Sequence, residues 1–193
     1  MSSLTVYSES GSKSPSVFIE HQAIADQLSL VGVLFERWQA DQVLSKEAGQ
    51  EEVVAAYRGA IDALNKKFDF KTLDVVSLTP DNPKKLEFRQ KFLAEHRHAD
   101  FEIRFFVDGC GLFYLHLDAK IYLVLCEKGD LISVPANTPH WFDMGRNPYF
   151  KALRFFTTPD GWVGDFTGSD IAQRFPSFEE HVAFLTQAGQ GKE

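Results

Sequence analysis

The amino-acid sequence predicts a mainly β fold, a single β-barrel that carries several α-helices at its periphery. Between residues 102 and 156 the chain contains six short apolar runs, each bounded by Gly, Asp, Asn or Pro, which is the pattern of closely spaced strands. Asp108-Gly109 and Asp118-Ala119 fit tight hairpin turns, so neighbouring strands should pair antiparallel and enclose a barrel. The expected strands are residues 102–107, 111–117, 120–127, 131–134, 140–143 and 150–156.

The remaining elements lie before and after these strands. Residues 50–66 form the clearest helix, because their apolar side chains share one face and Glu51 and Glu52 stand at the positive end of the helix dipole. Ser177 and Glu180 can form a capping box at the start of a terminal helix. The other expected elements are a strand at 4–6, a helix within 19–30, a strand at 31–35, a helix at 84–92, a short helix at 169–174 and the terminal helix at 177–185.

The 193 residues contain no internal repeat and are expected to form one domain. Residues 1–94 supply N-terminal strands and helices, residues 95–156 the barrel core, and residues 157–193 a C-terminal loop and helices. The 18 Phe, five Tyr and three Trp supply aromatic rings for the core and for the walls of a pocket.

Charge and composition exclude several classes of protein. The net charge of −7 and the pI near 5.4 argue against a nucleic-acid partner, because such proteins present a basic face. The sequence shows no secretory signal and no apolar run of transmembrane length, so we expect a cytoplasmic protein without a membrane partner. Cys110 and Cys126 are too few for a disulfide framework and should be small, buried thiols on neighbouring strands.

Four potential metal ligands stand out. His96 and His98 are separated by one residue, so on an extended backbone both imidazoles leave the same face. Glu102 can return to that side when the chain re-enters a strand, and His140 can arrive from another strand after a Pro-rich turn. Three imidazoles and a carboxylate suit iron(II), nickel, cobalt, manganese or zinc, and an octahedral ion would keep two positions open, as a catalytic site requires.

A plainer interpretation makes His96 and His98 surface residues and His140 a buried, hydrogen-bonded histidine. A longer pattern argues against it, because two segments of the chain resemble the two motifs of the cupin family of metal-binding barrels. The segments read His96-x-His98-xxx-Glu102-x6-Gly109 and Gly129-x5-Pro135-x-Asn137-x2-His140, with Asn137 in place of Gly and Met144 in place of the terminal Asn. The resemblance implies a single cupin jelly-roll barrel that binds a metal ion.

A narrower resemblance is to the acireductone dioxygenase family. It rests on the stretch from Glu95 to Gly109 and on the extension His140-Trp-Phe-Asp-Met-Gly145, and it covers most of residues 84–178. The resemblance implies a metal-dependent dioxygenase of methionine salvage, with one Fe(II) or Ni(II) ion per chain, and we expect a monomer. Its substrates would be dioxygen and the enediolate 1,2-dihydroxy-3-keto-5-methylthiopentene. The Fe form would yield 4-methylthio-2-oxobutanoate and formate, and the Ni form 3-methylthiopropanoate, formate and carbon monoxide.

Two arginines are expected to serve an anionic substrate. Arg104 lies two residues beyond Glu102 and should share its interior side, and the family resemblance links Arg104 to forming the substrate dianion. We expect Arg104 to act on the substrate and not on metal retention. Arg154 lies among apolar neighbours and needs a partner, either a protein carboxylate or a ligand oxygen.

Further residues acquire roles through the family resemblance. Glu95 matches a position implicated in metal loading, which is physically reasonable because a carboxylate near the ligands can fix a histidine tautomer. Phe101 departs from the family, in which the residue before the ligand Glu is commonly acidic. Phe92, Phe142 and Trp162 are candidates for an apolar wall around the methylthio chain, with simple packing in a Phe-rich core as the alternative.

Two other classes stay open at this point. The chain could be a different cupin metalloenzyme, such as a sugar isomerase, an oxalate-degrading enzyme or a flavonol dioxygenase. It could also be a sensor or storage module that binds a small molecule without catalysis. A sensor usually brings a DNA-binding domain, for which the residues after the barrel are too few, and storage cupins often lack the full ligand set.

Overall fold

One long strand, β6 (Glu102–Leu117), belongs to both sheets of the protein and sets the arrangement of the others. The computed structural model describes residues 1–11 and 14–190, with side chains up to residue 187. In one sheet the C-terminal half of β6 pairs with β7 (Lys120–Glu127) and β9 (His140–Asp143). In the other sheet the N-terminal half of β6 pairs with β8 (Asp130–Val134) and β10 (Phe150–Phe156).

Shorter strands extend both sheets. The additional pairs are β7 with β1 (Ser3–Ser8), β1 with β2 (Ser16–Phe18), β9 with β5 (His96–Arg97), β5 with β11 (Asp165–Phe166), β8 with β3 (Leu34–Arg37), and β10 with β4 (Thr72–Leu78). All of these pairs are antiparallel, and the mainly β architecture is confirmed. The order of strands within the described residues stays open at β2, β11, β3 and β4 and does not close into a complete barrel.

The hairpin expected at Asp108-Gly109 is wrong, because β6 continues through this dipeptide. Gly109 has φ +64°, and a Cβ there would overlap the backbone carbonyl of Tyr149. β10 pairs across the same position, with Phe150 opposite Gly109 and a bulge one pair further on. The glycine therefore bends a continuous strand from one sheet into the other. The second expected hairpin is confirmed: Asp118 and Ala119 have φ of 50° and 56°, and they reverse the chain between β6 and β7.

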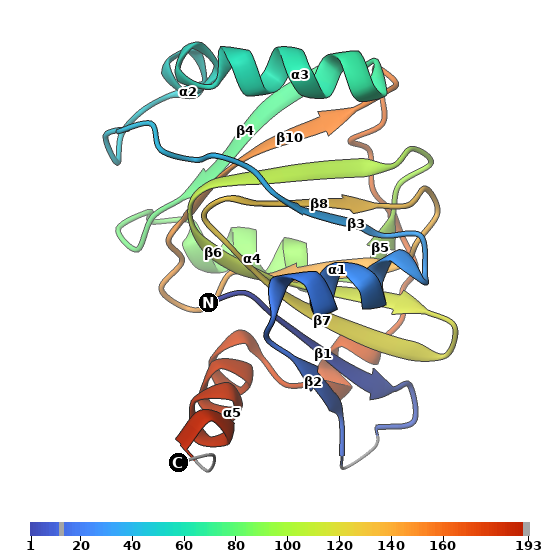
Figure 1. The fold of residues 1–193 in the computed structure, drawn as a ribbon. Coiled ribbons are helices and arrows are strands. Elements are labelled where there is room, and N and C mark those ends of the chain that lie inside the picture. The colour runs from blue at the N-terminus through green and yellow to red at the C-terminus, as the bar shows by residue number, and fades with distance from the viewer. Residues whose placement is uncertain (12–13, 191–193) are drawn as a thin grey trace.

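The helices lie at the periphery of the sheets (Figure 1). α2 (Gln50–Ala56) and α3 (Arg58–Phe68) lie above β4 and β10, and α5 (Phe178–Gln190) lies at the opposite end of the molecule. The remaining helices are α1 (His21–Ser29), α4 (Lys85–Leu93) and the short 3-10 helix η1 (Ile171–Arg174). No helix in the described part of the chain is long and apolar enough to cross a membrane.

The structure divides one predicted helix, confirms the cap of another and shifts one predicted strand. A single helix at 50–66 is wrong, because Tyr57 (φ −105°, ψ 20°) separates α2 from α3 and packs its ring edge-on against Phe105. The capping box is confirmed: the backbone N–H of Ser177 donates to Glu180 Oε2 at 2.8 Å, and the N–H of Glu180 donates to Ser177 Oγ at 3.4 Å. The strand expected at 31–35 is displaced to β3.

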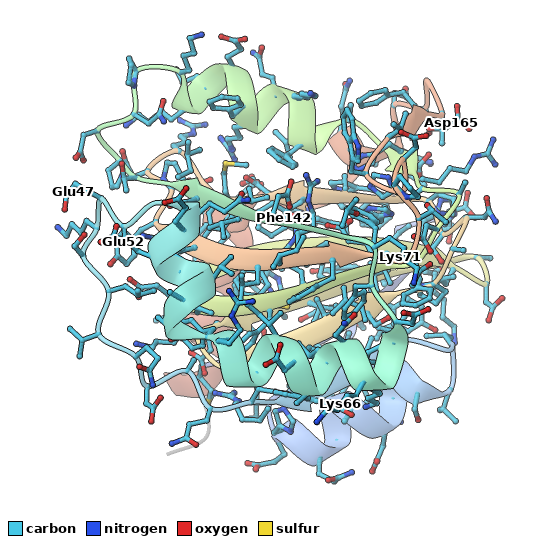
Figure 2. The ribbon with its side chains drawn as sticks, turned by 90° about the horizontal axis from the view of Figure 1, so that it is seen from above. Glu47, Glu52, Lys66, Lys71, Phe142 and Asp165 are labelled. Atoms are coloured by element: carbon cyan, nitrogen blue, oxygen red, sulfur yellow. The ribbon has the colours of Figure 1, made fainter. Side chains whose placement is uncertain are left out.

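The space between the sheets is filled by aromatic rings. Phe106 and Phe113 from the two halves of β6 meet Phe142 of β9, with Phe113 and Phe142 centroids 4.9 Å apart. Figure 2, which looks down on α2 and α3, shows Phe142 among the strands at the centre of the molecule. The prediction for the two cysteines is confirmed in part: Cys110 and Cys126 are free thiols on the neighbouring strands β6 and β7, but only Cys126 is buried, and Cys110 is half-buried.

Candidate metal centre

The pairing of β5 with β9 brings the predicted ligands together. His96 stands directly opposite His140 in this pair, and His98 follows two residues later on the same side. One ring nitrogen from each of these three histidines lies within 4.8 Å of those of the other two. Glu102, the first residue of β6, places Oε2 3.5 Å from His98 Nε2 and 3.4 Å from His140 Nε2. All four side chains are buried and converge on one point.

Each histidine is oriented by a backbone carbonyl. Nδ1 of His96 lies 2.8 Å from the carbonyl oxygen of Ala94, Nδ1 of His98 lies 3.0 Å from that of Val163, and Nδ1 of His140 lies 2.8 Å from that of Thr138. A carbonyl oxygen only accepts, so Nδ1 must carry the proton in all three rings. The lone pair of each ring is then on Nε2, the atom directed toward the common centre.

The electrostatics of the site favour the protonation states that bind a metal ion. Burial, together with the neighbouring His140, lowers the pKa of His96 to about 4, and burial lowers the pKa of His98 as well. Burial alone would raise the pKa of Glu102, but the charge of Arg104, the contact with His140 and the charge of Arg154 together outweigh it and hold that pKa well below its usual range. Near neutral pH His96 and His98 are therefore neutral imidazoles and Glu102 is an ionised carboxylate, the forms that bind a metal ion.

Arg104 shares the interior side with Glu102, as strand periodicity predicted. Its Nε and one terminal nitrogen donate to Oε1 of Glu102 at 3.1 and 2.5 Å, and its guanidinium lies 4.7 and 4.8 Å from the ring centres of Phe113 and Phe142. The arginine occupies Oε1 and leaves Oε2 directed toward the histidines. Its other terminal nitrogen is buried without a hydrogen-bond partner among the described residues. Arg104 thus contacts a predicted ligand and keeps one free donor.

These residues fit a resident metal ion. Nε2 of His140 is buried and has no hydrogen-bond partner in the described part of the structure, which is costly unless something else binds it. Three neutral imidazole nitrogens and one carboxylate oxygen suit Fe(II) or Ni(II), and sulfur ligands are absent from this described group. Four protein ligands would leave two positions of an octahedral ion for other molecules.

A cavity of about 710 Å³ opens onto the centre. Its polar lining includes His96, His98, Arg104 and Arg154, and its apolar lining includes Phe92 and Trp162, the latter 54% exposed. Phe142 is fully buried behind this wall, where its ring lies edge-on to Phe92 with centroids 6.2 Å apart. Of the three predicted wall residues, two therefore line the cavity and the third supports one of them.

The partner of Arg154 is a protein carboxylate. Nε and one terminal nitrogen of Arg154 donate to the two oxygens of Asp74 at 3.0 and 2.6 Å. Both residues line the cavity, and Asp74 belongs to β4, a strand that the sequence did not indicate. The pair therefore stands at the cavity wall.

Neither Glu95 nor Phe101 forms a side-chain hydrogen bond to a predicted metal ligand among the described residues. The Glu95 carboxylate contacts Nδ1 of His116 at 3.0 Å and accepts a hydrogen bond from Thr167 Oγ1 at 2.6 Å. The ring of Phe101 packs near Phe68 of α3, in the cluster on the outer side of β6. Sequence reasoning did not find Asp74 or the three backbone carbonyls that orient the histidines, because carbonyls leave no side-chain signal.

The fold and the converging ligands define a metal-binding protein of the cupin class. Residues 4–164 match the model of the ARD/ARD' family, so the chain belongs to that family. An acireductone dioxygenase of Hydrogenobaculum sp. (strain Y04AAS1) is 58% identical over 180 residues, which cover 93% of this chain and 98% of that protein. One of Aquifex aeolicus (strain VF5) is 53% identical over 182 residues, which cover 94% of this chain and 99% of that protein.

A solved structure agrees with these relatives. The acireductone dioxygenase from Bacillus anthracis, with a cadmium ion in its active centre, superposes with a TM-score of 0.76 at 27% sequence identity. The match covers 86% of this chain and 98% of that one. The predicted cupin fold and the predicted family are thereby confirmed.

Proposed function

We propose that this chain is a metal-dependent dioxygenase that cleaves acireductone with dioxygen. The observation that carries the proposal is the set of three Nε2 atoms and one carboxylate oxygen that converge beneath a cavity, beside an arginine with an unused donor. Membership of the ARD/ARD' family supports acireductone as the substrate. A bound Fe(II) or Ni(II) ion would supply Lewis-acid and redox chemistry, with open positions for an enediolate and dioxygen.

The side chains of the protein bind and orient the substrate. The free terminal nitrogen of Arg104 can donate to an enediolate oxygen, and its positive charge favours loss of the enediol protons. The Phe92 and Trp162 side chains offer an apolar wall for the methylthio chain, and they keep water away from that part of the cavity. Arg154, paired with Asp74, adds positive charge at the wall without presenting a fully unpaired guanidinium.

The products are proposed to depend on the ion, as the family resemblance implies. With Fe(II) we expect 4-methylthio-2-oxobutanoate and formate, and with Ni(II) we expect 3-methylthiopropanoate, formate and carbon monoxide. The same four ligands accept both ions, so the protein supplies one geometry and the difference must come from the ion or from how the substrate chelates it.

The test is to strip the protein of metal and to reconstitute separate samples with Fe(II) and Ni(II). Acireductone and dioxygen are supplied to both, organic acids are quantified, and the gas phase is assayed for carbon monoxide. Carbon monoxide from the nickel sample alone supports the proposal. Identical products from both samples would contradict metal control of the products, and no turnover with either would place the chain among other cupin enzymes.

We also propose that the chain acts as a cytoplasmic monomer built as one domain. The sharing of β6 by both sheets supports a single folding unit, because neither sheet is complete without it. Two free thiols agree with a reducing compartment. Light scattering on the metal-loaded protein, together with one cooperative unfolding transition, would test the assembly state and the domain count.

A further inference from the structure

Residues 157–167, here called the strap, run from the end of β10 across the metal centre to β11. The carbonyl oxygen of Val163 accepts the hydrogen bond from Nδ1 of His98, at 3.0 Å. Gly164 lies so close to His96 that a Cβ at this position would be 3.3 Å from Cδ2 of the ring. Trp162 and Phe166 line the cavity. One segment therefore orients a predicted ligand, covers a second ligand and forms part of the substrate wall.

Asp100, which lies between His98 and Glu102, holds the start of the strap. Its carboxylate is buried and accepts hydrogen bonds from the backbone N–H of Thr157 and Thr158 at 2.6 and 2.9 Å, and from their hydroxyls at 2.6 and 3.3 Å. The N–H of Phe101 adds a fifth donor at 2.9 Å. A carboxylate has about four lone-pair directions, so this one is saturated and has none left for a metal ion.

Gly161 allows the strap to approach this carboxylate. A Cβ at Gly161 would lie 2.7 Å from Oδ2 of Asp100 and 2.7 Å from Cβ of Phe156. Such a distance is shorter than van der Waals contact, so a larger residue would push the strap away from Asp100. The strap is thus packed tightly between the Asp100 carboxylate and the end of β10.

The far end of the strap is fixed separately. Thr167 donates its backbone N–H to the carbonyl of Glu95 at 3.1 Å and its hydroxyl to the Glu95 carboxylate at 2.6 Å. β11 pairs with β5 here, with Phe166 opposite His96. The two carboxylates that flank the His96-x-His98 segment therefore hold the two ends of the strap, and Val163 lies between them.

We propose that Asp100 is a positioning residue, which fixes the strap over the metal centre and, through the carbonyl of Val163, fixes the orientation and tautomer of His98. The geometry makes the effect selective. His96 and His140 donate to Ala94 and Thr138, which lie outside the strap. Release of the strap at Asp100 should therefore disturb His98 and leave the tautomers of the other two histidines unchanged.

The decisive variant is Asp100→Asn, studied by nitrogen-15 NMR of the imidazole rings in the metal-free, full-length protein near neutral pH. The wild type should show all three rings protonated at Nδ1. In the variant, His98 alone should change to a mixture of tautomers. Amide exchange at Val163 and Gly164 should become about tenfold faster, the factor that corresponds to loss of about one hydrogen bond.

Two further variants separate positioning from folding and from charge. Thr157→Val removes one of the five hydrogen bonds to Asp100 and should shift His98 in the same direction by a smaller amount, even if Asp100→Asn does not fold. Asp160→Asn removes the same charge from an exposed position of the strap, where no side-chain hydrogen bond is formed by the described residues, and should change nothing. An unchanged His98 in both Asp100→Asn and Thr157→Val, or an equal shift of all three rings, would overturn the proposal.

Activity provides a second readout, which rests on the proposed function. In protein loaded with Fe(II), Asp100→Asn should weaken metal binding about 10-fold or more, as is usual when the support of a ligand is lost. With metal at saturation, kcat/KM should recover in part. The imidazole spectra need no turnover, so a failure of the proposed acireductone chemistry would leave this test intact.

Discussion

Two regions of the protein each bury an arginine against a carboxylate, yet they differ in how completely the buried groups are satisfied. In the metal centre, Arg104 donates twice to Oε1 of Glu102, while Oε2 faces the histidines. In the second region, Arg89 of α4 donates to both oxygens of Asp143 at 2.7 and 2.8 Å. We call the Arg104–Glu102 pair open, because one carboxylate oxygen is not bound by the arginine. We call the Arg89–Asp143 pair closed, because the arginine binds both carboxylate oxygens.

The closed pair fastens the start of α5, and we call Arg89, Asp143 and α5 together the α5 anchor. The two oxygens of Asp143 also accept the backbone N–H groups of Gly145 and Phe178, each at 2.9 Å, so four donors saturate the carboxylate. A saturated buried pair holds structure but cannot bind anything further. The two pairs contain the same types of residue, so residue type alone does not distinguish a binding site from a structural ion pair. Unused polar atoms that converge on one point do distinguish them.

An unused atom is not sufficient by itself. His181 in the α5 anchor is fully buried, and neither ring nitrogen has a hydrogen-bond partner among the described residues. The three histidines of the metal centre form the one described group whose ligand atoms converge, and His181 is not part of it. Convergence therefore distinguishes a metal centre from an isolated buried histidine.

The largest expected effect comes from removing the charge of Glu102, the carboxylate of the open pair. Glu102→Gln removes the anionic oxygen that faces His98 and His140, so bound metal should fall to a small fraction and essentially all activity should be lost. Metal content by elemental analysis, together with turnover of acireductone, measures both. Asp143→Asn is the matched control, because it alters an equally buried carboxylate and should retain the metal. A fully metallated, active Glu102→Gln protein would remove Glu102 from the ligand set.

The parts of the metal centre that the sequence predicted are those set by local spacing along the chain. The spacing of His96, His98 and Glu102 predicted a shared face, and strand periodicity placed Arg104 beside the carboxylate, because these relations are local. Long-range partners were not predictable in this way. Asp74 comes from β4, and the carbonyl of Val163 comes from a loop 65 residues beyond His98, so neither has a local signal.

The errors in the fold prediction have physical causes of the same kind. Asp-Gly is a common hairpin signal, but at Asp108-Gly109 the close approach of the Tyr149 carbonyl uses the glycine to bend β6. The helix at 50–66 had the correct apolar face, but the backbone leaves the helical conformation at Tyr57, which belongs to that buried face and packs against Phe105.

The second prediction concerns the closed pair. Asp143→Asn should lower the free energy of unfolding by about 3–5 kcal/mol, because it leaves a largely buried arginine with only the exposed Glu179 as a counter-charge. Chemical denaturation of the metal-loaded protein measures this loss. Glu179→Gln is the control, since Glu179 is exposed and contacts the same arginine at 3.2 Å, and it should cost less than about 1 kcal/mol. Equal losses of unfolding free energy in the two variants would show that the saturated Asp143 carboxylate stabilises the protein no more than the exposed Glu179 does.

The third prediction sharpens the role of the unused donor on Arg104. Arg104→Lys keeps a positive charge but cannot both grip Oε1 with two nitrogens and present a further planar donor. We expect metal affinity to fall about 10–100-fold, because Glu102 loses its orientation. With metal saturating, kcat/KM should still fall about 100-fold, because stabilisation of the substrate anion is lost. Arg89→Lys should leave saturated kcat/KM unchanged, and a normal kcat/KM in Arg104→Lys would assign the residue to structure alone.

The last and smallest effect is the pH dependence of stability that His181 contributes. Burial lowers its pKa to about 4 in the folded protein, whereas the unfolded chain should have a value near 6.5, about that of a free histidine. Between these values the unfolded state binds the extra proton, so the contribution of His181 to stability is constant above about pH 6.5 and decreases as the pH falls toward 4.

The change is His181→Leu, which keeps the site apolar and removes the titration. Denaturation is followed from pH 7.5 to 4.5 for the metal-free variant and for the metal-free wild type, so that His96 titrates alike in both. Their difference in unfolding free energy should change by no more than about 1.4 kcal/mol per pH unit, the limit set by one proton. The wild type should be the one that loses more as the pH falls. Parallel curves for the two proteins would mean that the folded protein accommodates a charged His181, and an isolated buried histidine would then be less costly here than its lack of partners indicates.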